Sequence, residues 1–216
     1  MHFKSLTLAT LLSAVSALPS SNNNQHAARQ TSNSFTVMAA RSASPIHFLP
    51  LNARGSHFWL GGKTTSYCPD EVTEMGGQCP PGDVTGIAGQ SSLDVMVPGG
   101  QQIYVDNHGA LTFTIPHSGY IPPGSSVGPF EYEPAAPGQV IGHWYYTGQG
   151  ASGFMACPVP VANATEGAAL QKSPQWQVYA ALKNATVPSG NVGDCLGFSA
   201  MAVARNTTTP AAWEYI

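Results

Sequence analysis

The alternation of hydrophobic and polar positions in this chain is clearest in residues 102–114. Ile103 and Val105 alternate with their neighbours, and after a short break Leu111 and Phe113 resume the same pattern. A period of two places these four side chains on one face of two paired strands. The break between them consists of Asp, Asn, His and Gly, and Asp, Asn and Gly all tolerate a tight turn. The sequence therefore predicts a β-hairpin here.

Further short apolar runs, separated by turns rich in glycine and proline, predict about ten short strands in total. The other runs expected to form strands are 35–40, 46–51, 57–60, 93–97, 130–132, 140–147, 153–159, 176–182 and 196–205. Residues 115–138 are rich in proline, which cannot donate to a sheet ladder, so we expect a long surface loop around the strand at 130–132. One helical turn is expected at 166–171. The predicted fold class is all-β: a single compact domain of mainly antiparallel strands, closed as a sandwich, a barrel or a β-trefoil.

The start of the chain has the features of an export signal. Lys4 gives a positive start, residues 6–15 form a short apolar run, and small residues follow at 15–17. The run is shorter than the roughly 20 apolar residues that a membrane helix needs. We therefore expect residues 1–17 to be a signal peptide and the protein to be secreted.

The remaining boundaries follow from composition. Residues 18–34 contain almost no aliphatic side chains, which predicts a disordered tail. Residues 35–205 are expected to form the all-β domain, and 206–216 a C-terminal tail. The final residues, AAWEYI, do not resemble the hydrophobic tail of a lipid-anchor signal, so no membrane anchor is expected.

Charge is scarce in this chain. Only 9% of the residues are charged, against about 25% in typical soluble proteins, and the formal net charge is −3. The eight basic residues are scattered, whereas nucleic-acid binding needs clustered lysine and arginine. Nucleic acid is therefore excluded as a partner.

Four cysteines in an exported chain indicate two disulfides, for which three connectivities are possible. We expect Cys68 to pair with Cys79 and Cys157 with Cys195. A zinc site is the alternative, but the chain has no C-x-x-C pair and the four cysteines lie far apart. No metal or other cofactor is expected.

Three N-x-T sequons permit N-glycosylation on the secretory route, at Asn163, Asn184 and Asn206. Each lies near turn-forming residues, and we expect at least one to be used.

No catalytic constellation is convincing. Residues 124–128 match the G-x-S-x-G nucleophile elbow, but that motif needs a strand before Ser126 and a helix after it, and prolines flank it here. His143 is the one histidine downstream of this serine. An acidic group at 70–74 with Asp83 matches no calcium loop and is interpreted as a solvated loop. We expect no catalytic residues and no enzyme activity.

Exposed aromatic rings are the remaining candidates for a binding surface. Trp59, Trp144 and Trp176 are possible stacking platforms for sugar rings, although most aromatic residues in a β-domain fill the core.

Several stretches, in this order, resemble one family: AARSASPIHFLPLNARGSHFWLGG, TTSYCP, QQIYVDNHGALTFT, GFMACP, WQVYA and DCLGFSAMAVA. They are similar to the secreted fungal cell-wall proteins of the PhiA type, some of which are described as IgE-binding antigens. The resemblance covers most of residues 35–205. It implies a non-enzymatic protein of the fungal cell wall or medium, linked to the development of spore-bearing cells (conidiation), and it carries over no catalytic residues.

Three hypotheses follow from the residues and the resemblance. The first is a structural or interaction protein of the fungal cell wall, whose partners are wall polysaccharides or other wall proteins. The second is a carbohydrate-binding module or lectin-like protein. The third is a secreted hydrolase, which requires converging acids or a placed Ser–His pair.

Overall fold

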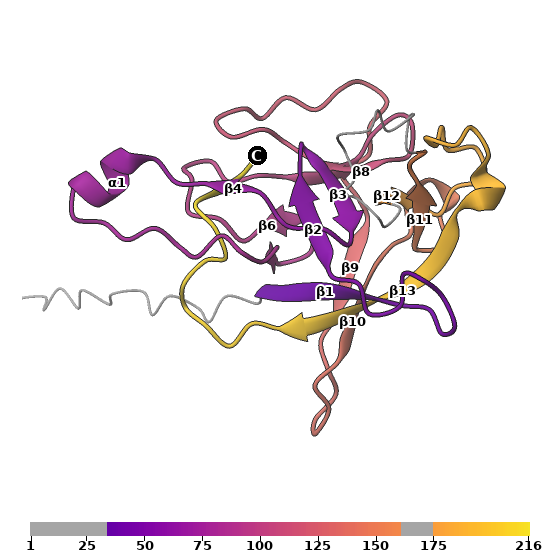
Figure 1. Cartoon of the computed structure of the whole chain (residues 1–216), viewed down its shortest axis with the longest axis horizontal. Helices are drawn as coiled ribbons and strands as arrows, with labels where there is room; N and C mark the ends of the chain where they lie inside the picture. The colour runs from indigo at the N-terminus through magenta and orange to yellow at the C-terminus, as the bar shows by residue number, and fades with distance from the viewer. Residues whose placement is uncertain (1–33, 161–174) are drawn as a thin grey trace, which may run out of the picture.

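The computed structural model of the chain describes residues 34–160 and 175–216 (Figure 1). The predicted signal peptide, nearly all of the predicted tail at 18–34, the sequon at Asn163 and the helical turn expected at 166–171 lie outside the described residues. Within them the chain is mainly β, as predicted, and no helix is long and apolar enough to cross a membrane.

Twelve strands form one sheet, and every pairing in it is antiparallel. They are β1 (Ser34–Ala40), β2 (Leu51–Arg54), β3 (His57–Leu60), β5 (Ile87–Ala88), β6 (Ser92–Leu93), β7 (Ile103–Val105), β8 (Leu111–Phe113), β9 (Phe130–Glu133), β10 (Gly142–Tyr146), β11 (Phe154–Pro158), β12 (Trp176–Ala180) and β13 (Leu196–Ala204). A separate pair joins β4 (Ser66–Tyr67) to β14 (Glu214–Tyr215). The helical elements are the single-turn α1 (Asp70–Glu74) and two 3-10 turns, η1 (Gly148–Gly150) and η2 (Val192–Asp194).

The longest strand, β13, organises the sheet. One of its edges pairs with β1, and the other pairs first with β11 and then with β10. The full path runs β6-β5-β1-β13-β11-β12-β3-β8-β7. Two backbone hydrogen bonds, from Leu93 N to Gln101 O (2.9 Å) and from Ile103 N to Ser91 O (2.8 Å), also join the two ends of this path.

The predicted hairpin at 102–114 is confirmed. Its strands β7 and β8 pair Ile103 with Phe113 and Val105 with Leu111. Asp106 holds the turn, because its Oδ1 accepts hydrogen bonds from the backbone N–H groups of His108 (2.9 Å) and Ala110 (2.8 Å). All six residues of the two strands are buried, so the hairpin is covered on both faces.

The core on the inner side of β1, β9, β10 and β11 is aromatic. Trp144 lies between Phe130 and Phe154, with ring centroids 5.6 Å and 4.7 Å away, and only 1% of its surface is exposed. Burial of such large rings is among the strongest stabilising contributions that a small domain has.

The structure corrects four expectations about the elements. The strand expected at 93–97 does not form: β6 ends at Leu93, and Val95 makes only an isolated bridge. Residues 46–51 do not form a strand: the chain turns there, with Phe48 at φ 62°, and the strand β2 begins at Leu51. The helix α1 was not predicted. The packed domain also continues past residue 205, because Ala211, Ala212 and Tyr215 are buried in the core.

Candidate functional site

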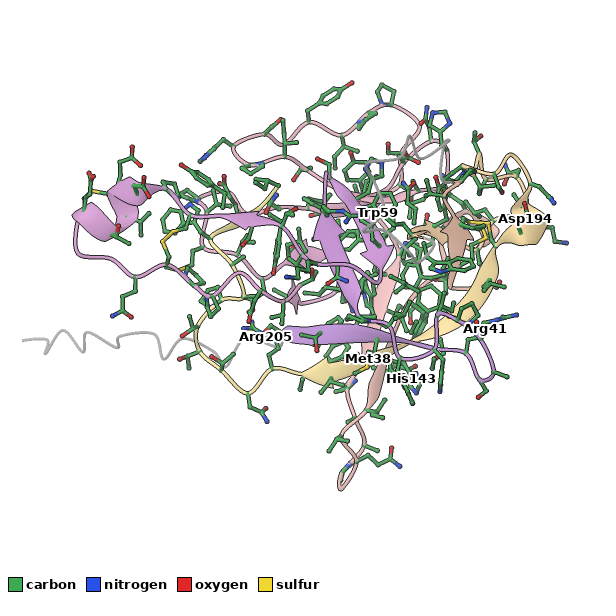
Figure 2. The ribbon with its side chains drawn as sticks, in the orientation of Figure 1. Met38, Arg41, Trp59, His143, Asp194 and Arg205 are labelled. Atoms are coloured by element: carbon green, nitrogen blue, oxygen red, sulfur yellow. A yellow bond between two sulfur atoms is a disulfide. The ribbon has the colours of Figure 1, made fainter. Side chains whose placement is uncertain are left out.

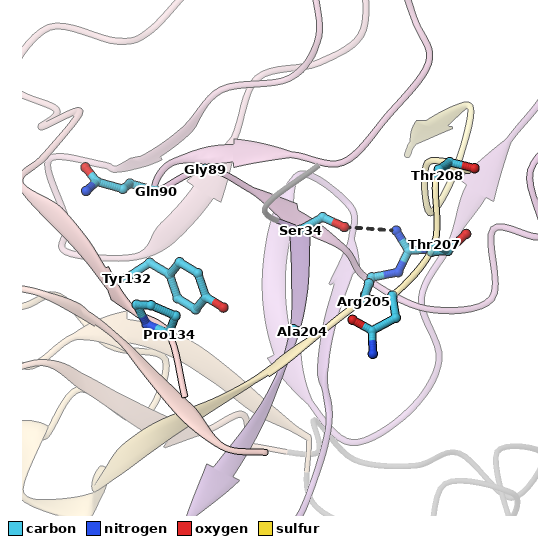
Figure 3. Close-up of a pocket in the computed structure, with 10 residues that line it drawn as sticks. Ser34, Gly89, Gln90, Tyr132, Pro134, Ala204, Arg205, Thr207 and Thr208 are labelled. Atoms are coloured by element: carbon cyan, nitrogen blue, oxygen red, sulfur yellow. Dashed lines mark hydrogen bonds between the residues drawn. The ribbon is translucent and has the colours of Figure 1, made fainter. Parts of the chain in front are cut away.

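A pocket of about 660 Å³ opens where the end of β13 faces β9 (Figure 3). Segments far apart in the sequence build it: the start of β1, the turn between β5 and β6, β9, and the chain that follows β13. Its lining residues are Ser34, Gly89, Gln90, Tyr132, Pro134, Ala204, Arg205, Asn206, Thr207 and Thr208.

Tyr132 provides the aromatic surface of this pocket. One face of its ring stacks on Phe35, with centroids 4.1 Å apart and an interplanar angle of 12°. The hydroxyl points across the pocket toward Ala204 and Arg205 (Figure 3). Burial raises the pKa of Tyr132 from its ordinary value of 10.0. Its hydroxyl, neutral at physiological pH at either value, can donate and accept hydrogen bonds.

The position of Tyr132 depends on β10. Trp144 is its partner across the ladder, and Gly142 lies so close to the carbonyl of Glu133 that a Cβ there would collide with it. The alternation along β9 then sends Phe130 and Tyr132 to the inner face, and Glu131 and Glu133 to the outer one.

Arg205 brings a charge to the pocket wall, and that charge is paired. Its guanidinium forms an ion pair with Asp94, whose side chain is 8% exposed. The same group donates to Ser34 Oγ (3.5 Å) and to the carbonyl of Thr209 (3.4 Å). Among residues 34–160 and 175–216, those that line the pocket include no His, Cys, Asp, Glu or Lys, so this part of the lining presents amide and hydroxyl groups beside the Tyr132 ring.

This combination suits an uncharged ligand with many hydroxyls. An aromatic face packs against the C–H groups of a sugar ring, and the surrounding side-chain amides and hydroxyls match its hydrogen bonds. A charged ligand would find no unpaired opposite charge among the lining residues that the structure describes.

The three tryptophans proposed as stacking platforms do not line this pocket. Trp144 and Trp176 are buried, with 1% and 9% of their surfaces exposed, so neither can present a ring face to a sugar. Trp144 instead supports the pocket from behind, because its Nε1 donates to the carbonyl of Gln90 (2.8 Å). Trp59 is half-buried, with the guanidinium of Arg54 4.9 Å from its ring centroid.

The sequence analysis missed Tyr132, whose only signal is its place in the alternating run FEYE.

The disulfides pair as expected, Cys68 with Cys79 and Cys157 with Cys195. The first closes the exposed segment that contains α1, and the second joins β11 to the start of β13. Among the described sequons, Asn184 and Asn206 are both exposed.

The candidate catalytic groups are dispersed. The Ser126 hydroxyl donates to the carbonyl of Gly128 (2.8 Å), and no helix follows it. His143 lies elsewhere, on β10, where its Nδ1 is 3.4 Å from Ser199 Oγ. Among residues 34–160 and 175–216, no group of three or more His, Cys, Asp or Glu side chains is placed to hold a metal ion.

The Ser199–His143 contact belongs to a second, shallower hollow of about 490 Å³ on the outer face of β9 and β10. There the Tyr145 hydroxyl lies 3.0 Å from a carboxylate oxygen of Glu131 and 2.8 Å from one of Glu133. These hydrogen bonds raise the pKa of Tyr145. Figure 2 shows His143 on the sheet face that also carries Met38.

The fold and the pocket define a class: an all-β, disulfide-bonded protein with a pocket on its sheet that is lined by a tyrosine ring, small apolar residues and side chains with amide and hydroxyl groups. The chain belongs to the family described as PhiA-like secreted proteins, whose family model matches residues 35–216. It is also 47% identical over 167 residues to an uncharacterized secreted protein of the fungus Arthroderma benhamiae, a match that covers 77% of each chain. No solved structure matches the chain significantly. The resemblance seen in the sequence is thereby confirmed, and the protein is a secreted one.

Proposed function

We propose that this protein is a non-enzymatic component of the fungal cell wall that holds neutral wall polysaccharide in the Tyr132 pocket. The observation that carries the proposal is the pocket itself: an aromatic ring stacked on Phe35, in a lining that offers amides and hydroxyls and whose one described charge, Arg205, is paired with Asp94. The role in the development of spore-bearing cells and the IgE-binding character belong to the same proposal, and the family resemblance supports them.

The composition of the chain agrees with this environment. A surface with few charges interacts with neutral polymers through hydrogen bonds and apolar contacts, and gains little from electrostatic steering. The low charge content, 9% of all residues, therefore fits a protein that remains among polysaccharides.

A binding experiment tests the pocket. Protein without glycans, secreted into the oxidising bacterial periplasm, is incubated with insoluble β-glucan and with chitin, and the bound fraction is measured. Tyr132→Ala is expected to weaken binding about tenfold, since losing roughly 1.4 kcal/mol of contact energy has that effect. Tyr120→Ala is the matched control, because Tyr120 is 70% exposed and does not line the pocket.

Two outcomes contradict the proposal. One is that neither polymer retains the protein; the other is that Tyr132→Ala binds as well as Tyr120→Ala. Fractionation of the producing cells tests the location separately, because a wall component must be recovered from the wall or from the medium.

A secreted hydrolase is the second candidate, and the observation that favours it is the Ser199–His143 contact at 3.4 Å. A serine activated by histidine cleaves esters or amides through a covalent intermediate. Hydrolysis of ester substrates by the purified protein, lost in Ser199→Ala and kept in Ser126→Ala, supports this candidate. No turnover by the unmodified protein excludes it.

A further inference from the structure

The sequon at Asn206 lies in the wall of the Tyr132 pocket. Asn206, Thr207 and Thr208, which together form the sequon, all line it. The other described sequon is different: the hollow beside Asn184 has a volume of about 130 Å³ and no Phe, Tyr or Trp in its lining. A glycan on Asn206 would therefore start next to an aromatic ring, and one on Asn184 would not.

The chain around Asn206 is anchored on both sides. The backbone N–H of Arg205 donates to the carbonyl of Ser34 (2.8 Å), and its side chain pairs with Asp94. On the far side, the N–H of Ala211 donates to the carbonyl of Asp94 (3.0 Å). The intervening residues 206–210 form a short loop fixed at both ends, so the first sugar of a glycan on Asn206 starts beside the pocket.

The chemistry of that sugar matches the pocket. The first residue of an N-linked glycan is N-acetylglucosamine, a neutral pyranose with hydroxyl and acetamide groups. The Tyr132 ring, which lines the pocket, can pack against the sugar ring, and Gln90, Thr207 and Thr208 offer amide and hydroxyl partners. Placing this sugar in the pocket costs little entropy, because the covalent bond to Asn206 already holds it there at a high effective concentration.

We infer that Asn206 carries an N-linked glycan whose first N-acetylglucosamine occupies the Tyr132 pocket. In the modification, Asn206 Nδ2 forms a bond to C1 of the sugar and loses a proton, while the bond from C1 to the diphosphate of a lipid-linked oligosaccharide donor breaks and the lipid diphosphate leaves. The pocket then holds either the protein's own glycan or a free polysaccharide. This consequence rests on the proposed function: the form without a glycan at Asn206 binds the wall polymer, and the glycosylated form does not.

A pair of substitutions at Thr208 isolates the glycan. Thr208→Ser keeps the sequon, and Thr208→Val removes it while Asn206 stays in place. Both proteins are secreted from a fungal host, and their gel mobility is compared before and after digestion with an N-glycosidase. We expect the Thr208→Val protein to lack one glycan. Equal mobility of the two undigested proteins would show that Asn206 is not modified, and would overturn the inference.

The position of the sugar is tested by a double-mutant cycle that combines the Thr208 substitutions with Tyr132→Ala. Its readout is the Tm, measured with no polysaccharide present. The glycosylated Thr208→Ser protein is expected to have a Tm about 2–4 °C above that of Thr208→Val, which corresponds to roughly 1 kcal/mol for a domain of this size. In the Tyr132→Ala background the difference should disappear. The same two variants without glycans, from bacterial periplasm, should have equal Tm values. Thr186→Val, which removes the sequon at Asn184, is the matched control. In this background the Tm of the Thr208→Ser protein should still exceed that of the Thr208→Val protein, and Tyr132→Ala should still remove the difference.

The inference fails if the Tm difference persists unchanged in the Tyr132→Ala background. The proposed function fails on a different measurement, the retention of glycan-free protein by β-glucan and chitin. If the double-mutant cycle succeeds and no polymer is bound, the pocket serves only its own glycan.

Discussion

Arg205 and Asp94 form an ion pair in which both partners are largely enclosed, with 13% and 8% of their side-chain surfaces exposed. The pair connects the end of β13 to the segment that follows β6, and so fixes one wall of the Tyr132 pocket. Enclosed charges are costly unless they are paired, so each partner depends on the other.

Replacing Asp94 with alanine is therefore expected to destabilise the domain by about 3–5 kcal/mol, because it leaves the guanidinium enclosed without a partner. Urea denaturation followed by circular dichroism measures the change in the free energy of unfolding. Lys183→Ala, at an exposed position, is the control and should change it by less than about 0.5 kcal/mol. If both variants lost a similar amount of unfolding free energy, the ion pair would not be what stabilises this wall of the pocket.

The stability of the domain should fall at alkaline pH because of its buried tyrosines. Burial, with a further contribution from the charge of Asp106, raises the pKa of Tyr179 from 10.0 to about 12. Below pH 10 this residue is neutral in both the folded and the unfolded chain. As the pH rises from 10 toward 12, the unfolded chain loses the proton first, so unfolding becomes more favourable.

Tyr179→Phe should therefore flatten the fall of the unfolding free energy between pH 10 and 12, measured by urea denaturation at fixed ionic strength. Burial also raises the pKa of Tyr215, so some pH dependence should remain. Tyr120→Phe, at an exposed position, is the matched control. An identical slope for Tyr179→Phe and the unmodified protein would rule out this explanation.

Local patterns in the sequence were sufficient for most strands. The hairpin at β7 and β8 is recognisable because its alternation and its turn residues lie within one short segment. The strand predicted at 46–51 was wrong because the prediction used only the apolar character of the run. Ile46 is buried, but Phe48 is 59% exposed in a turn. Hydrophobicity alone does not distinguish a buried turn from a strand.

The pocket was not predictable, because it depends on which strands pair. Tyr132 faces inward through the register of β9 on β10, and Trp144 is buried by the same pairing. Single-sequence patterns do not contain this register. The contribution of 211–215 to the core is equally non-local: the Tyr215 hydroxyl accepts from the N–H of Gly86 (2.9 Å) and donates to the carbonyl of Val84 (2.8 Å).

The two disulfides should differ in their effect on stability. Cys157 is fully buried beside Tyr179, and its disulfide links strands of the main sheet. Its partner lies 38 positions further along the chain, so loss of this bond should cost about 4 kcal/mol by loop-closure entropy. Cys68 and Cys79 are separated by only 11 residues, and their bond closes the α1 segment, which projects from one end of the molecule (Figure 1).

Paired serine substitutions test this difference. Cys157→Ser with Cys195→Ser should lower the Tm of the whole domain. The corresponding Cys68 and Cys79 variant should mainly speed proteolysis within 68–79. If the second pair lowers the Tm as much as the first, the α1 segment is part of the cooperative core.

Trp144 and Trp59 differ in how far their rings are buried, and so in their expected contribution to stability. Trp144→Ala removes a ring that contacts Phe130 and Phe154 and leaves the Gln90 carbonyl without its donor, so the expected cost is about 3–5 kcal/mol of unfolding free energy. Trp59→Ala, at a half-buried position, should cost less than half as much, because part of that ring is already in water. Urea denaturation of both variants measures these costs, and retention on β-glucan is assayed in parallel at low temperature, where both remain folded. If Trp144→Ala abolished retention without changing stability, its ring would have to reach the polymer, and the burial that the structure assigns to it would be wrong.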